Sequence, residues 1–222
     1  RFDDLYESQE EFMVLSDNRS VNEDFSDATV SLKNSTKMFL TKKDAEAFKV
    51  STKEGLEIKA TEWHKFPVEA DGRILAKRLC ELEVGDHLLV QRKEGVFGPG
   101  YDPDGAYDNG SALYWSDSIT WGGDKDTVQA YVCGAFKVES MSDLLDGSHS
   151  VESTNKQILQ DIQTLTLNLG LFSTISYTDD DTYLLQVVYD SDFTATVTGV
   201  EFYSIEDVYD VTVNDGHTIT CN

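Results

Sequence analysis

A threonine and a histidine near the end of a predicted strand form the first group that could act on a peptide bond. Residues 61–64 read TEWH, and in an extended chain Thr61 and Glu62 point to opposite faces. A turn after Trp63 brings the imidazole of His64 back to the side of Thr61. A hydroxyl and an imidazole that meet there can polarise an amide and protonate its leaving nitrogen, as an acyl shift requires. The alternative is that both residues are structural, because the spacing alone is a weak signal.

An aspartate and a second histidine flank a strong turn signal near the end of the chain. Asp210 and His217 lie on either side of residues 214–216, which read NDG, so we expect them on adjacent strands of one hairpin. A carboxylate can orient a nearby imidazole and stabilise its charged form, or act as a general base. The alternative is that Asp210 is an ordinary solvated strand residue.

Strands are expected to position these groups, because β-branched and aromatic residues alternate with polar ones over most of the chain. Residues 48–52 and 56–61 flank a short connection that contains Gly55, which predicts a hairpin with a left-handed turn position. Residues 78–90 predict a short turn and then a strand, separated by Gly85-Asp86. Residues 207–213 predict a further strand.

The middle of the chain has a different character. Gly and Asp crowd together from Val96 onward, which predicts a loop-rich entry into an inserted unit. One long helix is predicted within it, with Ser153 or Thr154 as its N-cap and Gly170 at its C-terminal end. The apolar residues of this helix recur at helical spacing: Ile158, Ile162, Leu165 and Leu169. A helix among strands predicts an α+β insert in a mostly β chain.

Composition and charge narrow the possible functions. The chain has 222 residues, 40% of them apolar, enough for one large or two modest domains with a buried core. Its 41 acidic and 18 basic residues leave a net charge of −23, which disfavours binding to nucleic acids and to anionic membranes.

Cysteine usage and hydropathy add further expectations. The three cysteines form no CxxC pair, so neither a disulfide framework nor a zinc site is predicted. We expect three core or surface thiols in a reducing compartment. No apolar run is long enough to span a membrane, and the first residues carry no leader signal. We therefore expect a cytoplasmic protein.

Taken in order, these segments resemble an intein, the self-splicing domain of the HINT class. The stretch GLEIKATEWHKFPV is similar to block B of that family, and RLCELEVGDHLLV to the L-x-x-GD step that follows it. The stretch VEFYSIEDVYDVTVNDGHTITCN is similar to block F. The middle stretch STNKQILQDIQTLTLNLGLFSTISY resembles the last helix and strand of a LAGLIDADG homing endonuclease.

The resemblance implies a horseshoe-like HINT β-fold with an inserted small α+β region. Residues 1–95 then form the N-terminal part of the splicing domain, residues 96–190 the insert, and residues 191–222 the C-terminal part. The implied function is protein splicing, a single-turnover autocatalytic reaction. It joins the flanking exteins through an acyl shift, a transesterification and an asparagine cyclisation, without a cofactor or a metal.

The resemblance also implies a role for each candidate residue. Thr61 and His64 match the block B pair that activates the N-terminal scissile amide. Asp210 matches the block F acid that assists transesterification and couples the two splice junctions. His217 matches the block F histidine that assists asparagine cyclisation.

Both ends of the chain depart from the family pattern. Residues 1–6 resemble only the end of block A, so the Cys or Ser nucleophile is expected on a complementary N-terminal segment. By the family spacing, Asn222 precedes a His-Asn ending that a C-terminal segment would carry. The alternative is a compressed ending, in which Cys221-Asn222 replaces His-Asn. The chain is thus expected to be the large fragment of a split or trimmed intein.

The insert is expected to be a degenerate endonuclease. Residues 130–140 resemble the second LAGLIDADG motif, with Glu139 at the acid position, although Ser140 and Lys137 replace family residues. Asp117 is the candidate acid of a barely recognisable first motif, and the two acids would hold Mg²⁺ in an active nuclease. The insert has only 3 basic residues against 15 acidic ones, which opposes duplex binding.

Two functions other than splicing remain open. One is a homing endonuclease or a DNA-binding remnant of one. The other is a β-rich interaction module without chemistry.

Overall fold

The computed structural model describes residues 6–17, 30–91, 93–117, 122–178, 180–189 and 193–213. The chain divides into unit 1, residues 1–92 together with 192–222, and unit 2, residues 93–191. The assignment of residues 1–95 and 191–222 to the splicing domain and of residues 96–190 to an insert stays a prediction. About 42% of the described structure is strand and 26% is helical, and all of its sheets are antiparallel, so the predicted mostly β class is confirmed.

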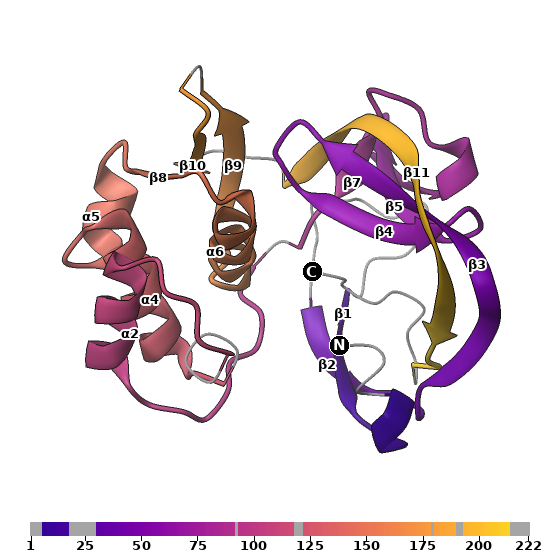
Figure 1. The fold of residues 1–222 in the computed structure, drawn as a ribbon, viewed down its shortest axis with the longest axis horizontal. Coiled ribbons are helices and arrows are strands. Elements are labelled where there is room, and N and C mark those ends of the chain that lie inside the picture. Colours follow the sequence, from indigo (N-terminus) through magenta and orange to yellow (C-terminus); the bar gives the residue numbers. More distant parts are fainter. Residues whose placement is uncertain are drawn as a thin grey trace. The chain divides into compact units, whose positions relative to one another are not determined.

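Unit 1 is built almost entirely from strands (Figure 1). Its elements are β1 (Met13–Asp17), β2 (Val30–Asn34), β3 (Phe39–Thr52), β4 (Glu57–Thr61), β5 (Lys65–Ala70), β6 (Arg73–Arg78), the 3₁₀ turn η1 (Leu79–Glu81), β7 (His87–Leu89) and β11 (Thr194–Asp210). Six strands form one antiparallel sheet in the order β4-β3-β11-β7-β5-β6. β1 and β2 pair separately.

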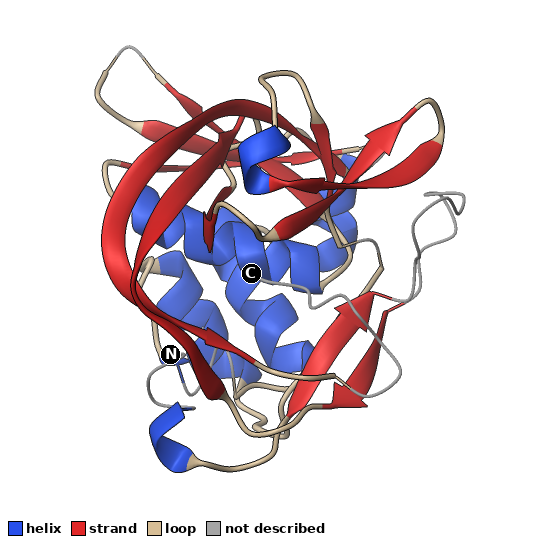
Figure 2. Ribbon diagram, turned by 90° about the vertical axis from the view of Figure 1, so that its right-hand side faces the viewer, coloured by secondary structure: helices blue, strands red, loops and turns tan. Residues whose placement is uncertain are grey.

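β3 and β11 form a long, curved pair of strands (Figure 2). Their pairing runs from Val197 opposite Thr52 to Asp210 opposite Phe39, with four register shifts along the way. Such bulges bend a strand and increase its twist. β11 therefore starts in the core of unit 1, where Val197 is fully buried, and curves away to end at Asp210.

The predicted β3–β4 hairpin is confirmed. The Gly55 N–H donates to the Thr52 carbonyl at 3.1 Å, and Gly55 has φ +87°, a conformation that glycine adopts without strain. The inner face of the sheet and one residue of η1, Leu79, form the core of unit 1; the sheet contributes Val50, Phe66, Val68, Leu88 and Val197. On the other face, Lys49 pairs with Glu201 at 2.8 Å.

Unit 2 combines helices with a small sheet. Its elements are α2 (Pro103–Ser111), α4 (Lys125–Phe136), α5 (Met141–Asp146), β8 (Ser150–Ser153), α6 (Lys156–Asn168), β9 (Phe172–Tyr177) and β10 (Tyr183–Val188). The strands form an antiparallel sheet in the order β8-β10-β9, and α6 packs against all three. Apolar residues from the helices and the sheet share one core.

The predicted long helix is α6. Its four periodic apolar residues are all buried, and Gly170 beyond its end has φ +77°. The N-cap differs from the prediction, because the Asn155 side chain accepts the Gln157 N–H at 3.1 Å. Ser153 instead accepts the N–H of Asn155. Among the described helices, α6 is the longest, and none is long and apolar enough to cross a membrane.

The stretch expected to be loop-rich contains a helix, α2, and a second one, α4, follows it. The Asp102 carboxylate accepts the Gly105 N–H at 3.1 Å and begins α2. α2 and α4 meet at two glycines: a Cβ on Gly110 would lie 2.1 Å from the Tyr131 carbonyl oxygen, and one on Gly134 would lie 2.2 Å from that of Tyr107. Each helix thus has a glycine where the backbone of the other helix comes too close to leave room for a side chain.

Candidate functional site

Thr61 and His64 occupy the two ends of one tight turn. β4 ends at Thr61 and β5 begins at Lys65. The His64 N–H donates to the Thr61 carbonyl at 3.0 Å, which closes a β-turn. The predicted reversal is present, but it is centred on Glu62 and Trp63 rather than after Trp63. We call residues 61–64 the TxxH turn.

The surroundings of His64 set its protonation state. His64 lies at the surface of unit 1, and its ring lies edge-on to that of Phe66, with 5.1 Å between ring centroids. Partial burial among protein atoms lowers the pKa of His64 below 6.5, while the charge of Asp210 acts in the opposite direction. Because burial is the larger effect, the imidazole is mostly neutral at about pH 7 and can accept a proton.

Asp210 reaches the same region from the other end of unit 1. It is the exposed last residue of β11, and one of its carboxylate oxygens accepts the Val211 N–H at 2.7 Å. Its carboxylate is close enough to raise the pKa of His64. Thr61 and His64 therefore share one turn, and the charge of Asp210 acts on His64, whereas His217 lies outside the described residues.

The candidate acids of the insert lie in unit 2. Glu139 is exposed and follows Lys137, which ends α4 in a left-handed conformation. Asp117 accepts the Trp115 indole N–H at 2.8 Å. Burial raises the pKa of Asp161 in α6; a hydrogen bond from Gln157 lowers it, and the charge of Asp117 raises it. Among the described residues, no group of three or more His, Cys, Asp or Glu side chains could hold a metal ion.

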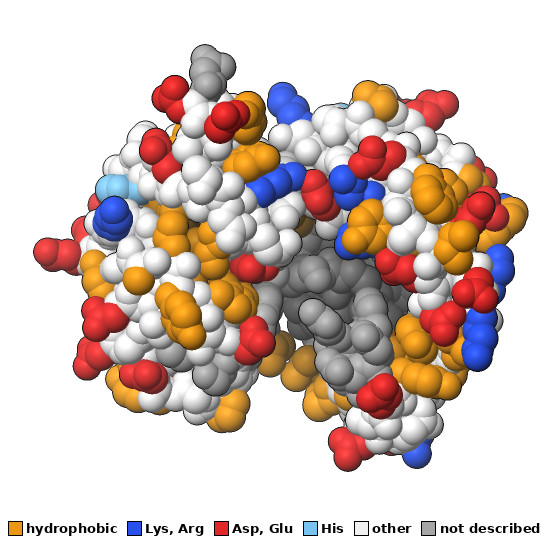
Figure 3. All heavy atoms as spheres, in the orientation of Figure 1, with side chains coloured by type: hydrophobic (Ala, Val, Ile, Leu, Met, Phe, Trp, Pro, Cys, Tyr) orange, Lys and Arg blue, Asp and Glu red, His pale blue; other side chains and the backbone are white. Residues whose placement is uncertain are grey.

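On the face drawn in Figure 3, acidic side chains are scattered over both units, and basic side chains are fewer. In unit 2, the three strands of the sheet contain no lysine or arginine. Duplex-binding surfaces usually carry Lys and Arg to neutralise phosphates. The sheet of the insert thus lacks the basic side chains expected of a DNA-binding sheet.

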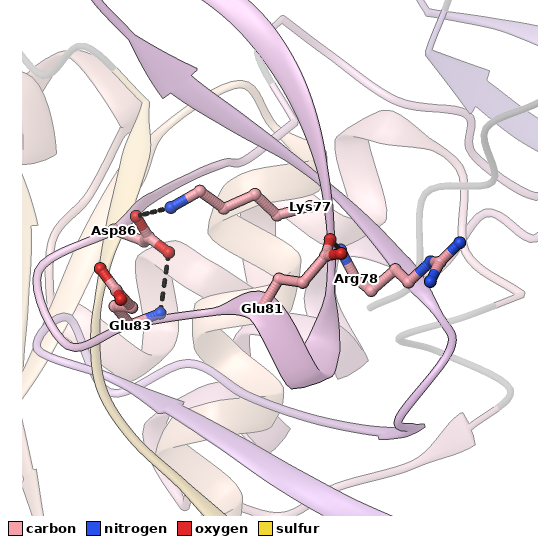
Figure 4. A network of polar contacts seen from close by, with 5 residues as sticks. All are labelled: Lys77, Arg78, Glu81, Glu83 and Asp86. Atoms are coloured by element: carbon pink, nitrogen blue, oxygen red, sulfur yellow. Dashed lines mark hydrogen bonds and ion pairs between the residues drawn. The ribbon is translucent and has the colours of Figure 1, made fainter.

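A polar network that the sequence did not predict surrounds the Gly85-Asp86 step (Figure 4). The Asp86 carboxylate pairs with Lys77 at 2.6 Å and accepts the Glu83 N–H at 2.9 Å. Burial is the largest single effect and acts to raise the pKa of Asp86, but these hydrogen bonds and the charges of Lys77 and His87 together hold the pKa below 3.8. The L-x-x-GD pattern indicated this turn. The pairing of Lys77 with Asp86 could not be predicted from the pattern, because Lys77 precedes it on β6.

Comparison with known proteins gives two relatives from curated sequences. The ribonucleoside-diphosphate reductase NrdEB subunit alpha of Bacillus subtilis (strain 168) is 48% identical over 104 residues. The match covers 47% of this chain and 10% of that protein. The subunit of the same name from Bacillus phage SPbeta matches with the same values. The matched part thus spans only about a tenth of the length of these relatives.

Among solved structures, the G-1F mutant of the Ssp DnaB mini-intein variant M86 matches with 19% identity and a TM-score of 0.35, covering 96% of this chain and 77% of that one. The M86 variant itself matches with 19% identity and a TM-score of 0.32, covering 91% and 66%. The model of the intein splicing domain family matches residues 1–221. Because this match covers nearly the whole chain, the chain belongs to the intein splicing domain family, and its function is protein splicing.

Proposed function

We propose that Thr61, His64 and Asp210, together with His217, carry out the splicing chemistry of this chain. The observation that supports this assignment is the action of the Asp210 charge on His64, which links the TxxH turn to a residue far along the chain. Without that approach, the turn would be an ordinary connection between β4 and β5.

In the proposed first step, the nucleophile of the N-terminal junction attacks the preceding carbonyl carbon. The Thr61 hydroxyl donates a hydrogen bond to the carbonyl oxygen, on which negative charge develops. Neutral His64 takes the proton of the nucleophile and delivers it to the departing nitrogen as the C–N bond breaks. The lowered pKa of His64 suits this exchange, because the ring can both accept and release a proton near neutral pH.

In the proposed later steps, Asp210 assists transesterification, in which the first residue after the intein attacks the new ester or thioester. The effect of its charge on His64 supports a coupling of the two junctions. His217 assists the asparagine cyclisation that releases the intein.

The proposed partners are the flanking exteins and two complementary segments. An N-terminal segment supplies the Cys or Ser nucleophile, and a C-terminal segment supplies the His-Asn ending. The names of the two matched Bacillus proteins support a ribonucleoside-diphosphate reductase alpha subunit as the host of this intein.

Endonuclease activity is the second candidate function, and the insert supports it less well. The insert is strongly acidic, its sheet strands carry no basic residues, and Lys137 stands where the motif has an acid. We propose that unit 2 is a degenerate endonuclease remnant. Nicking of duplex DNA in Mg²⁺, abolished by Glu139→Gln, would contradict this assignment.

The test of the splicing assignment uses the precursor in which this chain lies between its natural flanking residues, with any complementary segment added. We expect Thr61→Ala and His64→Ala to slow N-terminal cleavage by an added thiol about 100-fold or more. Lys65→Ala, an exposed change one residue further along, is the matched control and should cleave like the wild type. Wild-type thiolysis in the His64 variant would refute the role of His64.

A further inference from the structure

The 3₁₀ turn η1 is bonded directly to the TxxH turn. The Leu79 N–H donates to the His64 carbonyl at 2.8 Å, and the Cys80 N–H donates to the Glu62 carbonyl at 3.1 Å. These two bonds come from successive amides of η1 and hold two of the four residues in the TxxH turn. The orientation of the His64 backbone therefore depends on the orientation of η1.

Glu81 closes the start of η1. Its carboxylate accepts the Arg78 N–H at 2.8 Å, the kind of bond by which an acidic side chain closes the first turn of a helix. Short 3₁₀ turns have poor internal hydrogen-bond geometry. A side-chain hydrogen bond at the start of such a turn therefore helps to fix its backbone conformation. Figure 4 shows the Glu81 carboxylate at the backbone of Arg78. Because Arg78 directly precedes Leu79, this bond restrains the backbone that carries the Leu79 and Cys80 amides.

Two further contacts anchor the same segment. The Arg78 guanidinium lies over the ring of Trp63, with its central carbon 5.2 Å from the ring centroid. The Asp86 carboxylate accepts hydrogen bonds from the Lys77 ammonium group and the Glu83 N–H. The Asp86 carbonyl accepts the Val197 N–H of β11 at 2.8 Å. Residues 77–86 are thus fixed at both ends; between them Leu79 is buried in the core of unit 1, and Glu81 accepts the Arg78 N–H.

We propose that Glu81 is a positioning residue for His64, acting through η1 on the TxxH turn. The proposal rests on the proposed role of His64 in the N-terminal step. Catalysis of this kind is sensitive to placement, since an error of about 1 Å can cost about 100-fold in rate. Glu81 does not itself touch the reacting amide in this proposal; its effect passes through backbone hydrogen bonds.

Three variants separate geometry from charge. Glu81→Ala removes the acceptor, Glu81→Gln keeps an acceptor oxygen but removes the charge, and Glu83→Ala removes a carboxylate from the same loop. Glu83 is a suitable control because it enters the network through its backbone N–H. Each variant is measured for thiol-induced N-terminal cleavage in the precursor and for the NMR titration of the His64 imidazole.

We expect Glu81→Ala to slow cleavage about tenfold and to move the titration of His64 upward toward 6.5, because a loosened turn readmits water to the ring. Glu81→Gln and Glu83→Ala should match the wild type in both readouts. Equal behaviour of Glu81→Ala and Glu83→Ala would overturn the proposal. So would a Gln variant that behaves like the Ala variant, since charge rather than geometry would then be the cause.

Two further results of the experiment are informative. If the wild-type precursor shows no cleavage, the proposed role of His64 fails, while the titration difference between Glu81→Ala and Glu83→Ala still decides whether Glu81 positions the ring. If Glu81→Ala does not fold, Glu81→Asp replaces it, because it keeps the charge but shortens the reach. Slower cleavage with a shifted titration supports the proposal, and wild-type values in both readouts overturn it.

Discussion

At the residue scale, the protonation of His64 depends on two opposing effects. Burial lowers the pKa of His64, and the charge of Asp210 raises it. We expect Asp210→Asn to lower the pKa of His64 further, because the raising effect is lost while burial remains. NMR titration of the imidazole measures this shift. Asp207→Asn makes the same charge change on β11 and is the control; an unchanged titration in Asp210→Asn would show that Asp210 does not act on His64.

The same shift predicts a pH dependence of stability. The unfolded chain takes up a proton on His64 at pH 6.5, whereas the folded chain does so only at lower pH. Protonation therefore favours unfolding, so stability is highest above about pH 6.5 and falls as the pH drops through the folded pKa. Urea denaturation at several pH values should show a smaller decline for His64→Gln than for the wild type. Parallel declines would assign the pH dependence to other groups.

The sequence identified the residues of the TxxH turn more readily than their partners. A hydroxyl and an imidazole three residues apart suggest a turn, because both lie in one local segment. The approach of Asp210 to His64 depends on the curvature of β3 and β11, which no local pattern encodes; only the family resemblance suggested it. The proposed role of Glu81 could not be predicted from the sequence, because its effect on His64 passes through backbone amides and no residue pattern marks it.

At the element scale, local signals predicted the β3–β4 hairpin and α6 but not α2. The hairpin has a glycine where its turn needs a positive φ, and α6 has regular apolar spacing. α2 contains two glycines and two aspartates in nine residues, which favours a loop on propensity alone. Its helix is stabilised by the Asp102 cap and by packing against α4, and the second of these is a tertiary effect.

The contact between α2 and α4 gives a prediction for its two glycines. Alanine favours a helix over glycine by about 1 kcal/mol, but an added Cβ would lie 2.1–2.2 Å from a carbonyl oxygen of the other helix. We expect the clash to prevail, so Gly110→Ala and Gly134→Ala should each destabilise unit 2 by about 1–3 kcal/mol. Chemical denaturation measures the change. Gly199→Ala is the control, because nothing lies within 4 Å of its added Cβ; stabilised helix variants would contradict the close packing.

At the scale of the whole molecule, the two units have separate cores. The core residues of unit 1 and unit 2 are different sets with no member in common. Leu159→Ala, at a fully buried position of unit 2, should cost about 2–5 kcal/mol. Hydrogen exchange should show this loss in unit 2 and leave unit 1 and the His64 titration unchanged. Equal losses in both units would mean that they unfold as one.

The net charge of −23 predicts how salt acts on the folded chain. Salt weakens repulsion among the acidic side chains, and it also weakens ion pairs such as Lys49–Glu201 and Lys125–Glu94. Exposed ion pairs each contribute only about 0–1 kcal/mol, whereas the excess of carboxylates acts over the whole surface. We therefore expect the melting temperature, and the association with any complementary segment, to rise with NaCl.

Electrostatic screening can be separated from general salting effects by its range. Because the screening length falls to about 8 Å near 0.15 M salt, most of the gain should occur below a few tenths molar, on the order of the concentration at which exposed charges stop interacting. Sucrose, which carries no charge, should not reproduce this early rise. A melting temperature that stays flat or falls between low salt and about 0.3 M NaCl would show that ion pairs outweigh repulsion in this chain.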